Sequence, residues 1–341
     1  MANVESAPLC LQYAMWALAA SSSEKYDGRQ SDFYQRARKN AEVDEMKGCG
    51  ELTTTVRHCQ TWILIATYEF KQMYFPSAWI STGRAVRLAQ MMQLHKIDEN
   101  GEENPCPEDW AEREEHRRTF WMGFCIDRYA SIVAGWPMVI DERDVSLSVM
   151  ESLAAVNHGQ IYTNLPSSEE AFGSSAPMQT ESLVKAMSEG KSANPQPFGG
   201  IVLTAALLGR NLLSQDRLSP GDNDHDLDGE FWTHHRAMEA TLLDIALGLP
   251  DNLRLPPKLT NPNVVFFNMS LHAATICLHQ TAIFKADKQR LPATVSSDSK
   301  VRCITAAGEI ASLMRIISHV DLNLVSTPTQ SLDKHILILR R

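Results

Sequence analysis

Apolar residues recur every three or four positions along most of the chain, which is the spacing of α-helices that bury one face or more. Before residue 100 this spacing predicts helices at Leu9–Ser22, from Ser31 to Asn40 and onward, at Thr53–Tyr74 and at Ser77–Leu94. After residue 200 it predicts Ile201–Leu213, Glu230–Leu247, Asn263–Phe284 and Val301–Ser318. Strand-like alternation bounded by hairpin dipeptides is hard to find. The pattern therefore predicts an all-α fold, a large multi-helix bundle of stacked helical hairpins.

One segment, Glu112–Val145, has the sequence EREEHRRTFWMGFCIDRYASIVAGWPMVIDERDV. Its residues from Phe120 to Val133 are nearly all apolar and fall on more than one helical face, which is typical of a helix surrounded by others. Gly135 and Pro137 are residues that end helices. The segment therefore predicts a buried helix that ends at a Gly-x-Pro turn. We expect its aromatic residues to pack in the core of the domain. The alternative is that they line a pocket for a small-molecule effector.

Charged residues stand at the start of this helix, and two more fall within its apolar stretch. Glu114 stands one turn before Arg118, the favourable order for an ion pair on a helix. Asp127 and Arg128 fall within the apolar stretch, where each ion needs a partner. Three neighbouring glutamates offset Arg117 and Arg118, which disfavours phosphate binding. The prediction is that one of these arginines pairs inward, with Asp127 or a buried carbonyl, and that the other stays solvated.

The helix before this segment carries small side chains at three- and four-residue spacing. This stripe predicts a packing seam where a neighbouring helix approaches closely, formed by Ala78, Thr82, Ala85, Ala89 and Met92. Arg84 and Arg87 lie on another face. Ion pairing or solvation is the expected role of these two arginines, and a ligand contact is the alternative.

Together the two helices resemble the middle homology region of the fungal zinc-cluster transcription factors. That region has an acidic-Arg-Arg-x-Phe-Trp helix, an Asp-Arg pair and a Gly-Arg-Pro turn in this order, after a helix with an Ala-x-Arg-Leu-Ala core and a Leu-His ending. Here Trp136 replaces the arginine of the turn. The positions that carry the resemblance, interpreted as structural or regulatory, are Arg84, Arg87, Leu88, His95, Glu114, Arg117, Arg118, Phe120, Trp121, Asp127, Arg128, Gly135 and Pro137.

The resemblance implies a regulatory domain, effector or inhibitory, that controls transcription by RNA polymerase II in the nucleus. It implies partners among the transcription machinery or co-regulators, with a small-molecule inducer and homodimerisation as options. DNA would be reached only through the family's zinc-cluster module, whose six closely spaced cysteines are absent from these residues. Zinc is expected to lie in that module, so no cofactor is expected here. The chain is expected to be a natural regulator without a DNA-binding head or a truncated gene product.

Composition predicts a globular, soluble domain and disfavours direct DNA binding, a disulfide framework and a zinc ribbon. The 32 basic and 41 acidic residues give a net charge of -9, the wrong sign for gripping phosphate backbones over a broad surface. The seven cysteines are far apart and include no Cys-x-x-Cys, which favours reduced thiols over a disulfide framework or a zinc ribbon. No phosphate loop, nucleophile elbow or zinc-protease helix is present, so an enzyme is not expected.

Two other interpretations stay open beside the regulatory one. The first is a helical scaffold that binds partner proteins and has no role in transcription. The second is a metal site on the predicted helix Asn263–Phe284, where His272 and His279 lie near Cys277. Histidines inside a helical core more often bind carbonyls or hydroxyls, and this role is expected here.

Segment composition predicts the domain organisation. Residues 1–150 and 201–319 are expected to be the N-terminal and C-terminal parts of one helical domain. Residues 157–200 are rich in Ser, Pro and Gly, which predicts a long disordered insertion. Residues 320–341 are expected to be an atypical, truncated tail. The apolar run Leu259–Phe284 is long enough to span a membrane, but its polar residues favour a place in a protein core.

Overall fold

The structure, a computed structural model, describes residues 7–99, 107–140, 161–189, 195–216, 227–255 and 261–317. These residues form eleven α-helices and three short 3-10 helices, and no strand occurs among them. The all-α prediction is confirmed. The chain divides into two compact units, and their described residues run up to Thr180 in the first unit and from Glu181 to Ile317 in the second.

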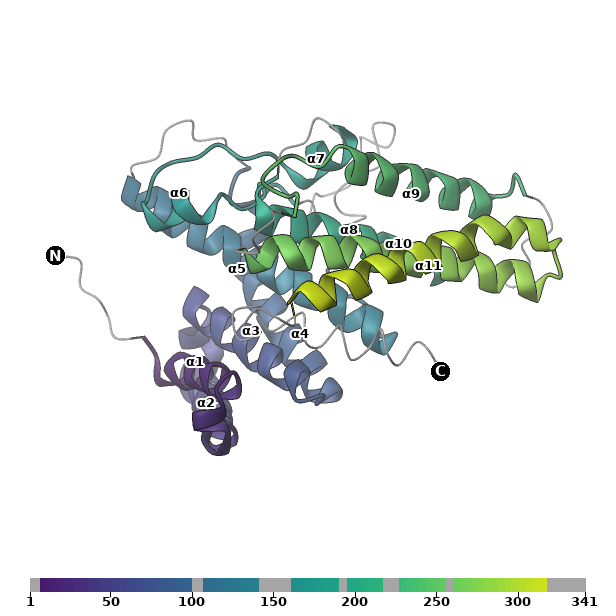
Figure 1. The fold of residues 1–341 in the computed structure, drawn as a ribbon. Helices are drawn as coiled ribbons and strands as arrows, with labels where there is room; N and C mark the ends of the chain where they lie inside the picture. The colour runs from purple at the N-terminus through teal and green to yellow at the C-terminus, as the bar shows by residue number, and fades with distance from the viewer. Residues whose placement is uncertain are drawn as a thin grey trace, which may run out of the picture. The chain divides into compact units, whose positions relative to one another are not determined.

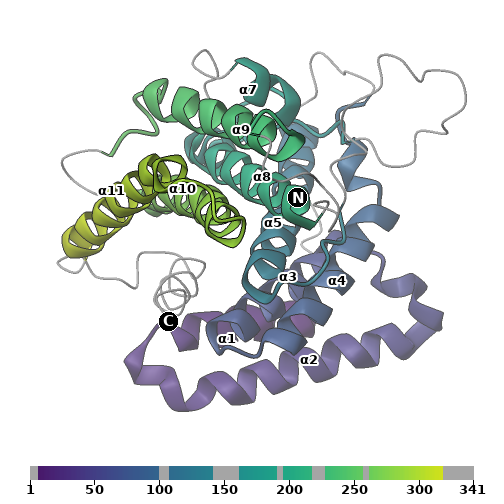
Figure 2. The same ribbon diagram turned by 90° about the vertical axis from the view of Figure 1, so that its right-hand side faces the viewer.

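The first unit is built from helices that pair with their neighbours along the chain. Helix α1 packs on α2, α3 packs on α4, and both α3 and α4 pack on the long helix α5 (Figures 1 and 2). The bounds are α1 Leu9–Ser21, α2 Gln30–Met46, α3 Val56–Lys71, α4 Phe75–Met91, α5 Pro107–Ala134 and α6 Glu169–Gly173, with 3-10 helices η1 Glu24–Arg29, η2 Lys47–Thr53 and η3 Leu94–Lys96.

Small side chains and local caps explain the pairing of α3 with α4. The hydroxyl of Thr55 accepts the main-chain N–H of His58 and so caps the start of α3. The Cys59 thiol donates to the main-chain oxygen of Ala85 at 3.3 Å, a contact that needs close helices. The small residues Ala78, Thr82, Ala85 and Ala89 are all buried, which confirms the predicted seam at these four positions. Met92, the fifth, follows the end of α4 and is partly exposed.

The second unit surrounds helix α10, which packs against α8, α9 and α11 (Figure 1). Asn261 and Pro262 begin α10, and the side-chain oxygen of Asn261 accepts the N–H of Asn263 at 2.9 Å. Gly200 permits the close approach of α8, because an added Cβ would lie 2.9 Å from the ring of Phe267. The bounds are α7 Leu183–Glu189, α8 Pro197–Asp216, α9 Glu230–Leu247, α10 Pro262–Lys288 and α11 Ala293–Ile317.

The structure corrects the prediction of a disordered insertion at 157–200. Within it, residues 161–189 and 195–200 hold α6, α7 and the start of α8. Thr163, Leu165 and Ser167 are each only 1% exposed. The composition misled because this segment is fixed largely by main-chain and hydroxyl hydrogen bonds, which a search for apolar periodicity does not detect. The boundary between the two units falls inside the same stretch.

Other predicted segments lie outside the described residues. These are residues 141–150 of the N-terminal part, residues 157–160 and 190–194 of the insertion, and the tail 320–341. None of the described helices has the length and apolar character needed to cross a membrane. Helix α10 covers most of the apolar run and buries three of its polar residues, Asn268, Ser270 and His279.

Candidate functional site

Most of the charged signature residues gather in two buried clusters on helix α5. The Glu114 cluster, near the start of α5, consists of Asp98, Glu114, Arg117, Arg118 and Glu169. The second cluster lies near the end of the same helix. This Asp127 cluster consists of Asp127, Arg128 and the main chain at 139–140.

Glu114 is the shared acid of the first cluster, and it is fully buried. Its Oε1 accepts from Nε of Arg118 at 3.0 Å and from the main-chain N–H of Ser167 at 2.9 Å. Its Oε2 accepts from Nη1 of Arg117. The predicted pairing of Glu114 with Arg118 is confirmed, and one carboxylate also holds the second arginine.

Both arginines have a second acid. Arg117 binds Asp98 through two nitrogens, at 2.7 and 3.2 Å, and Asp98 also accepts the main-chain N–H of Asn164 at 2.8 Å. Arg118 binds both carboxylate oxygens of Glu169, at 2.9 and 3.0 Å. The prediction that one of the two arginines stays solvated is therefore wrong, because the nearby carboxylates satisfy both of them.

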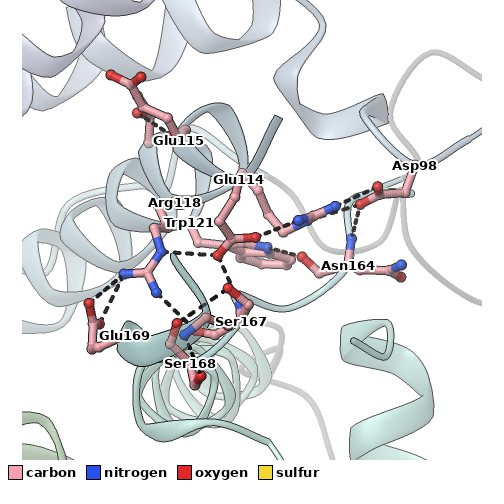
Figure 3. Close-up of polar contacts among 12 residues, drawn as sticks. Asp98, Glu114, Glu115, Arg118, Trp121, Asn164, Ser167, Ser168 and Glu169 are labelled. Atoms are coloured by element: carbon pink, nitrogen blue, oxygen red, sulfur yellow. Dashed lines mark hydrogen bonds and ion pairs between the residues drawn. The ribbon is translucent and has the colours of Figure 1, made fainter. Parts of the chain in front are cut away.

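The segment around residues 162–169 is hydrogen-bonded to both α5 and η3. The indole N–H of Trp121 donates to the main-chain oxygen of Asn164 at 2.7 Å. The main-chain oxygen of His95 accepts the N–H groups of Tyr162 and Thr163, at 2.8 and 3.2 Å. Figure 3 shows Arg118 between Glu114 and Glu169, with Ser167 beside them. The arginines of α5 thus anchor a segment about fifty residues further along the chain.

The Asp127 cluster is closed by the turn that follows α5. The carboxylate of Asp127 accepts the main-chain N–H groups of Val139, at 3.0 and 3.1 Å, and of Ile140, at 3.1 Å, and it pairs with Arg128 at 3.0 Å. Asp127 and Arg128 are both fully buried. Burial raises the pKa of Asp127, although Arg128 and the two main-chain N–H groups oppose this rise. The guanidinium of Arg128 lies over the ring of Phe124, 4.3 Å from its centroid.

Gly135 allows the chain to reverse toward Asp127. Its φ of +68° is in the left-handed region, and its N–H donates to the main-chain oxygen of Ser131 at 2.8 Å. Pro137 is exposed in the turn. Trp136 replaces the family's arginine, and its ring lies 5.2 Å from that of Trp79 on α4, so an aromatic contact occupies this position.

The remaining signature residues lie outside the two clusters. Arg84 lies over the ring of Trp62, 4.3 Å from its centroid, and 3.6 Å from a carboxylate oxygen of Glu45, which fits its expected ion-pairing role. Arg87 is exposed. Leu88 is partly buried, and Phe120 is buried with its ring 5.0 Å from that of Trp121. Leu88 and Phe120 contribute to packing, and none of these residues joins the two clusters.

Four residues that complete the Glu114 cluster and the segment 162–169 were not predicted from the sequence: Asp98, Asn164, Ser167 and Glu169. Their partners are distant along the chain, so no local spacing reveals them. A weaker signal was present, since Ser168 followed by glutamates is typical of a helix start. Ser168 does cap α6 and accepts the N–H of Ala171 at 3.1 Å.

The chemistry of the two clusters is structural. Arginines or main-chain N–H groups bind each carboxylate, and the central ones, Glu114 and Asp127, are inaccessible to a substrate. The arrangement fixes the course of the chain around α5. A binuclear zinc cluster does not fit this chain, because its seven cysteines are not closely spaced.

Comparison with known proteins places these observations in a family. The family model described as the fungal specific transcription factor domain matches residues 2–246. The pigment biosynthesis transcriptional activator pigB of Monascus ruber is 29% identical over 322 residues, which are 92% of this chain and 54% of that protein. The citrinin biosynthesis transcriptional activator ctnR of Monascus purpureus is 30% identical over 272 residues, 80% of this chain and 44% of that protein.

The tropolone cluster transcription factor tropK of Talaromyces stipitatus is 26% identical over 321 residues, 93% of this chain and 54% of that protein. The chain therefore spans about half the length of these relatives. No solved structure matches it significantly.

Proposed function

We infer the function of this chain from the family to which it belongs, that of the fungal specific transcription factor domains. It is a regulatory domain of a fungal transcription factor, homologous to activators of secondary-metabolite gene clusters, and it is not an enzyme. We propose that it acts in the nucleus on transcription by RNA polymerase II. In this proposal the domain restrains or licenses a DNA-binding head and an activation segment.

The observation that carries the proposal is the family match, which covers all described residues of the first unit. It is joined by the two buried ion clusters of α5, which together are called the brace. A domain that controls others through contacts must present the same surface each time. Buried ion pairs with several hydrogen bonds each favour one arrangement of the chain, as the two α5 clusters do here.

DNA binding by this chain alone is not part of the proposal. Arg117 and Arg118 are engaged by Asp98, Glu114 and Glu169, so binding a phosphate would require breaking these pairs. The net charge of -9 also opposes attraction to DNA. A gel-shift titration at physiological salt tests this point, and sequence-specific binding by these residues would overturn it.

The relatives suggest the kind of target. Their names refer to pigment biosynthesis, citrinin biosynthesis and a tropolone cluster. We propose that this chain regulates genes of one such biosynthetic cluster. Its deletion in the source fungus should change the transcripts of a neighbouring cluster. Unchanged transcripts, with the protein captured on an unrelated helical partner, would instead favour the interaction-scaffold alternative.

A reporter fusion tests regulation directly. The chain is placed between a heterologous DNA-binding module and a constitutive activation segment, and reporter output is compared with that of a fusion lacking the chain. Output should fall at least several-fold if the domain restrains activation. Equal output at equal nuclear protein level would contradict the restraining function.

Two matched arginine variants link this function to the brace. Arg118→Ala removes a paired arginine of the Glu114 cluster, whereas Arg87→Ala removes an exposed arginine of α4. The first variant should relieve the restraint, and the second should preserve it. If both variants behave alike, the brace has no specific part in regulation.

A further inference from the structure

Three side chains from three different helices of the first unit converge on one point. They are Cys10 of α1, Asp44 of α2 and His58 of α3, and one ligand atom from each lies within 4.8 Å of the other two. A thiol, a carboxylate and an imidazole are the side chains that bind zinc in proteins. This group takes no part in either α5 cluster.

We propose that Cys10, Asp44 and His58 form a binding site for a divalent transition-metal ion of the zinc type. Sulfur and nitrogen ligands favour zinc or cobalt, while magnesium and calcium prefer oxygen alone. Three protein ligands leave the fourth position of a tetrahedral zinc site open for water. The ion would join α1, α2 and α3 at a single point.

The orientation of His58 supports the site. Its Nδ1 lies 2.8 Å from the hydroxyl of Thr55, the residue that caps α3. A proton on Nδ1 leaves the lone pair on Nε2, the arrangement that outer-shell partners enforce in metal-bound histidines. Among the described residues Nε2 is buried without a hydrogen-bond partner, and it lies 3.5 Å from Oδ2 of Asp44. A cation between these two atoms would satisfy both.

Asp44 provides both charge and access. Its Oδ1 accepts from the ammonium of Lys47 at 2.8 Å, which leaves Oδ2 directed at His58. The Asp44 side chain is 25% exposed and that of Lys47 is 60% exposed, so an ion has a route from solvent. Burial tends to raise the pKa of Asp44, but Lys47 and His58 outweigh it and lower this pKa, so the carboxylate is ionised at neutral pH.

Cys10 closes the site on its buried side. Its side chain is fully buried, and its sulfur lies 3.5 Å from the hydroxyl of Thr61. Burial raises the pKa of this thiol, so without an ion it stays protonated. On binding, the sulfur–hydrogen bond is replaced by a sulfur–metal bond, and the proton leaves to solvent. Binding should therefore tighten as the pH rises.

The test uses the purified full chain, stripped with a chelator and then titrated with Co²⁺ alone. A thiolate ligand gives a sulfur-to-cobalt charge-transfer band in the near ultraviolet, and the titration should saturate at one ion per chain. Equilibrium dialysis with Zn²⁺ alone, read by elemental analysis, should give the same stoichiometry. The absence of any stoichiometric ion would overturn the proposal and leave a direct contact between His58 and Asp44 as the alternative.

Matched variants identify the ligands. Cys10→Ser should abolish the charge-transfer band, and Asp44→Asn and His58→Gln should each weaken Co²⁺ binding by more than the roughly 10–100-fold that loss of an outer-shell partner costs. Cys49→Ser, which changes an exposed cysteine of the same unit, should bind like the natural chain. A band that survives in Cys10→Ser would overturn the proposal and point to a different thiol, such as Cys277.

X-ray absorption on the natural chain loaded with Zn²⁺ keeps the proposal falsifiable if a variant does not fold. The zinc should have one sulfur neighbour among nitrogen and oxygen neighbours. No sulfur neighbour, or several, would overturn the assignment. The outcome is independent of the transcriptional proposal, which rests on reporter output and transcripts.

Discussion

The two units keep polar side chains in their interiors by different means. The first unit buries ions: Glu114, Asp127 and Arg128 are all fully buried, and each belongs to a network of opposite charges. The second unit buries mainly neutral groups, among them His235 and His279, which are only 6% and 2% exposed. Lys285, which lies over the ring of Phe231, shows that this is a tendency and not a rule.

This difference determines which change in the chain or in the solvent lowers the stability of each unit. A buried ion pair is vulnerable when one partner is removed, because the other ion stays in a poorly solvating interior. A buried neutral histidine is vulnerable to protons, because charging it inside the core costs free energy. Removal of one ion of a buried pair should therefore destabilise mainly the first unit, and acid should destabilise mainly the second.

The largest expected effect is that of Asp127→Ala. It leaves Arg128 buried without its carboxylate and removes the acceptor for two main-chain N–H groups, so the free energy of unfolding should fall by about 4 kcal/mol. Urea denaturation followed by circular dichroism measures the change. Glu112→Ala, at a side chain 73% exposed, is the control and should change stability by less than about 0.5 kcal/mol. Equal effects of the two variants would contradict the role of the Asp127 cluster.

Glu114→Gln should have the next largest effect and lower the free energy of unfolding by about 3 kcal/mol. The variant keeps the size of the side chain and an oxygen for the N–H of Ser167, but it removes the charge shared by Arg117 and Arg118. Both arginines keep their other acids, which is why the loss should be smaller than for Asp127. Hydrogen exchange should locate the loss in α5 and in the segment 162–169. A loss confined to the second unit would refute the interpretation.

Acid should weaken the second unit selectively. Burial lowers the pKa of His235 and of His279 to about 4, from an ordinary value of 6.5. The unfolded chain therefore takes up protons first, so the stability contributed by the neutral histidines is complete above about pH 6.5 and is lost as the pH falls toward about 4. Between about pH 7 and about pH 5.5 the loss should be about 2 kcal/mol.

Hydrogen exchange, corrected for the intrinsic effect of pH, can follow this loss in one sample. The amides of α10 should lose protection before those of α5, which serve as an internal control. Equal loss in both helices, or earlier loss in α5, would remove the contrast between the units.

The smallest effect is expected for Glu169→Ala. Both carboxylate oxygens of Glu169 accept from Nη1 of Arg118, but the Glu169 side chain is 53% exposed, so the free energy of unfolding should fall by less than about 1 kcal/mol. High salt should reduce this loss further, because solvent ions screen an exposed pair. Unfolding titrations at low and high salt measure both. A loss as large as that of Glu114→Gln would mean that exposure does not weaken this pair.

Features set by short spacing could be predicted from the sequence. The buried helix α5, its end at Gly135 and the pairing of Glu114 with Arg118 each depend on residues within one or two helical turns. His279 was expected to bind a carbonyl or hydroxyl in the core, and its Nδ1 lies 3.1 Å from the hydroxyl of Ser299.

Features that join distant segments could not be predicted. Nothing in the local pattern indicates that Asp98 would bind Arg117, or that the N–H of Ser167 would bind Glu114. The composition of residues 161–169 is typical of disorder, yet main-chain groups and hydroxyls fix this segment to α5 and η3. The three side chains of the proposed metal site are likewise far apart in sequence, and only the packing of α1, α2 and α3 brings them together.

The hydrogen bonds from the main chain at 139–140 to Asp127 determine where the domain can accept extra residues. They hold both ends of the Gly135–Met138 turn together, whatever the length of chain between them. Extra residues placed after Pro137, which is exposed, would add only loop-closure entropy, about 0.6 kcal/mol for each doubling of loop length. This turn is therefore a place where the domain can accept insertions, and thus acquire new surface, without disturbing its interior.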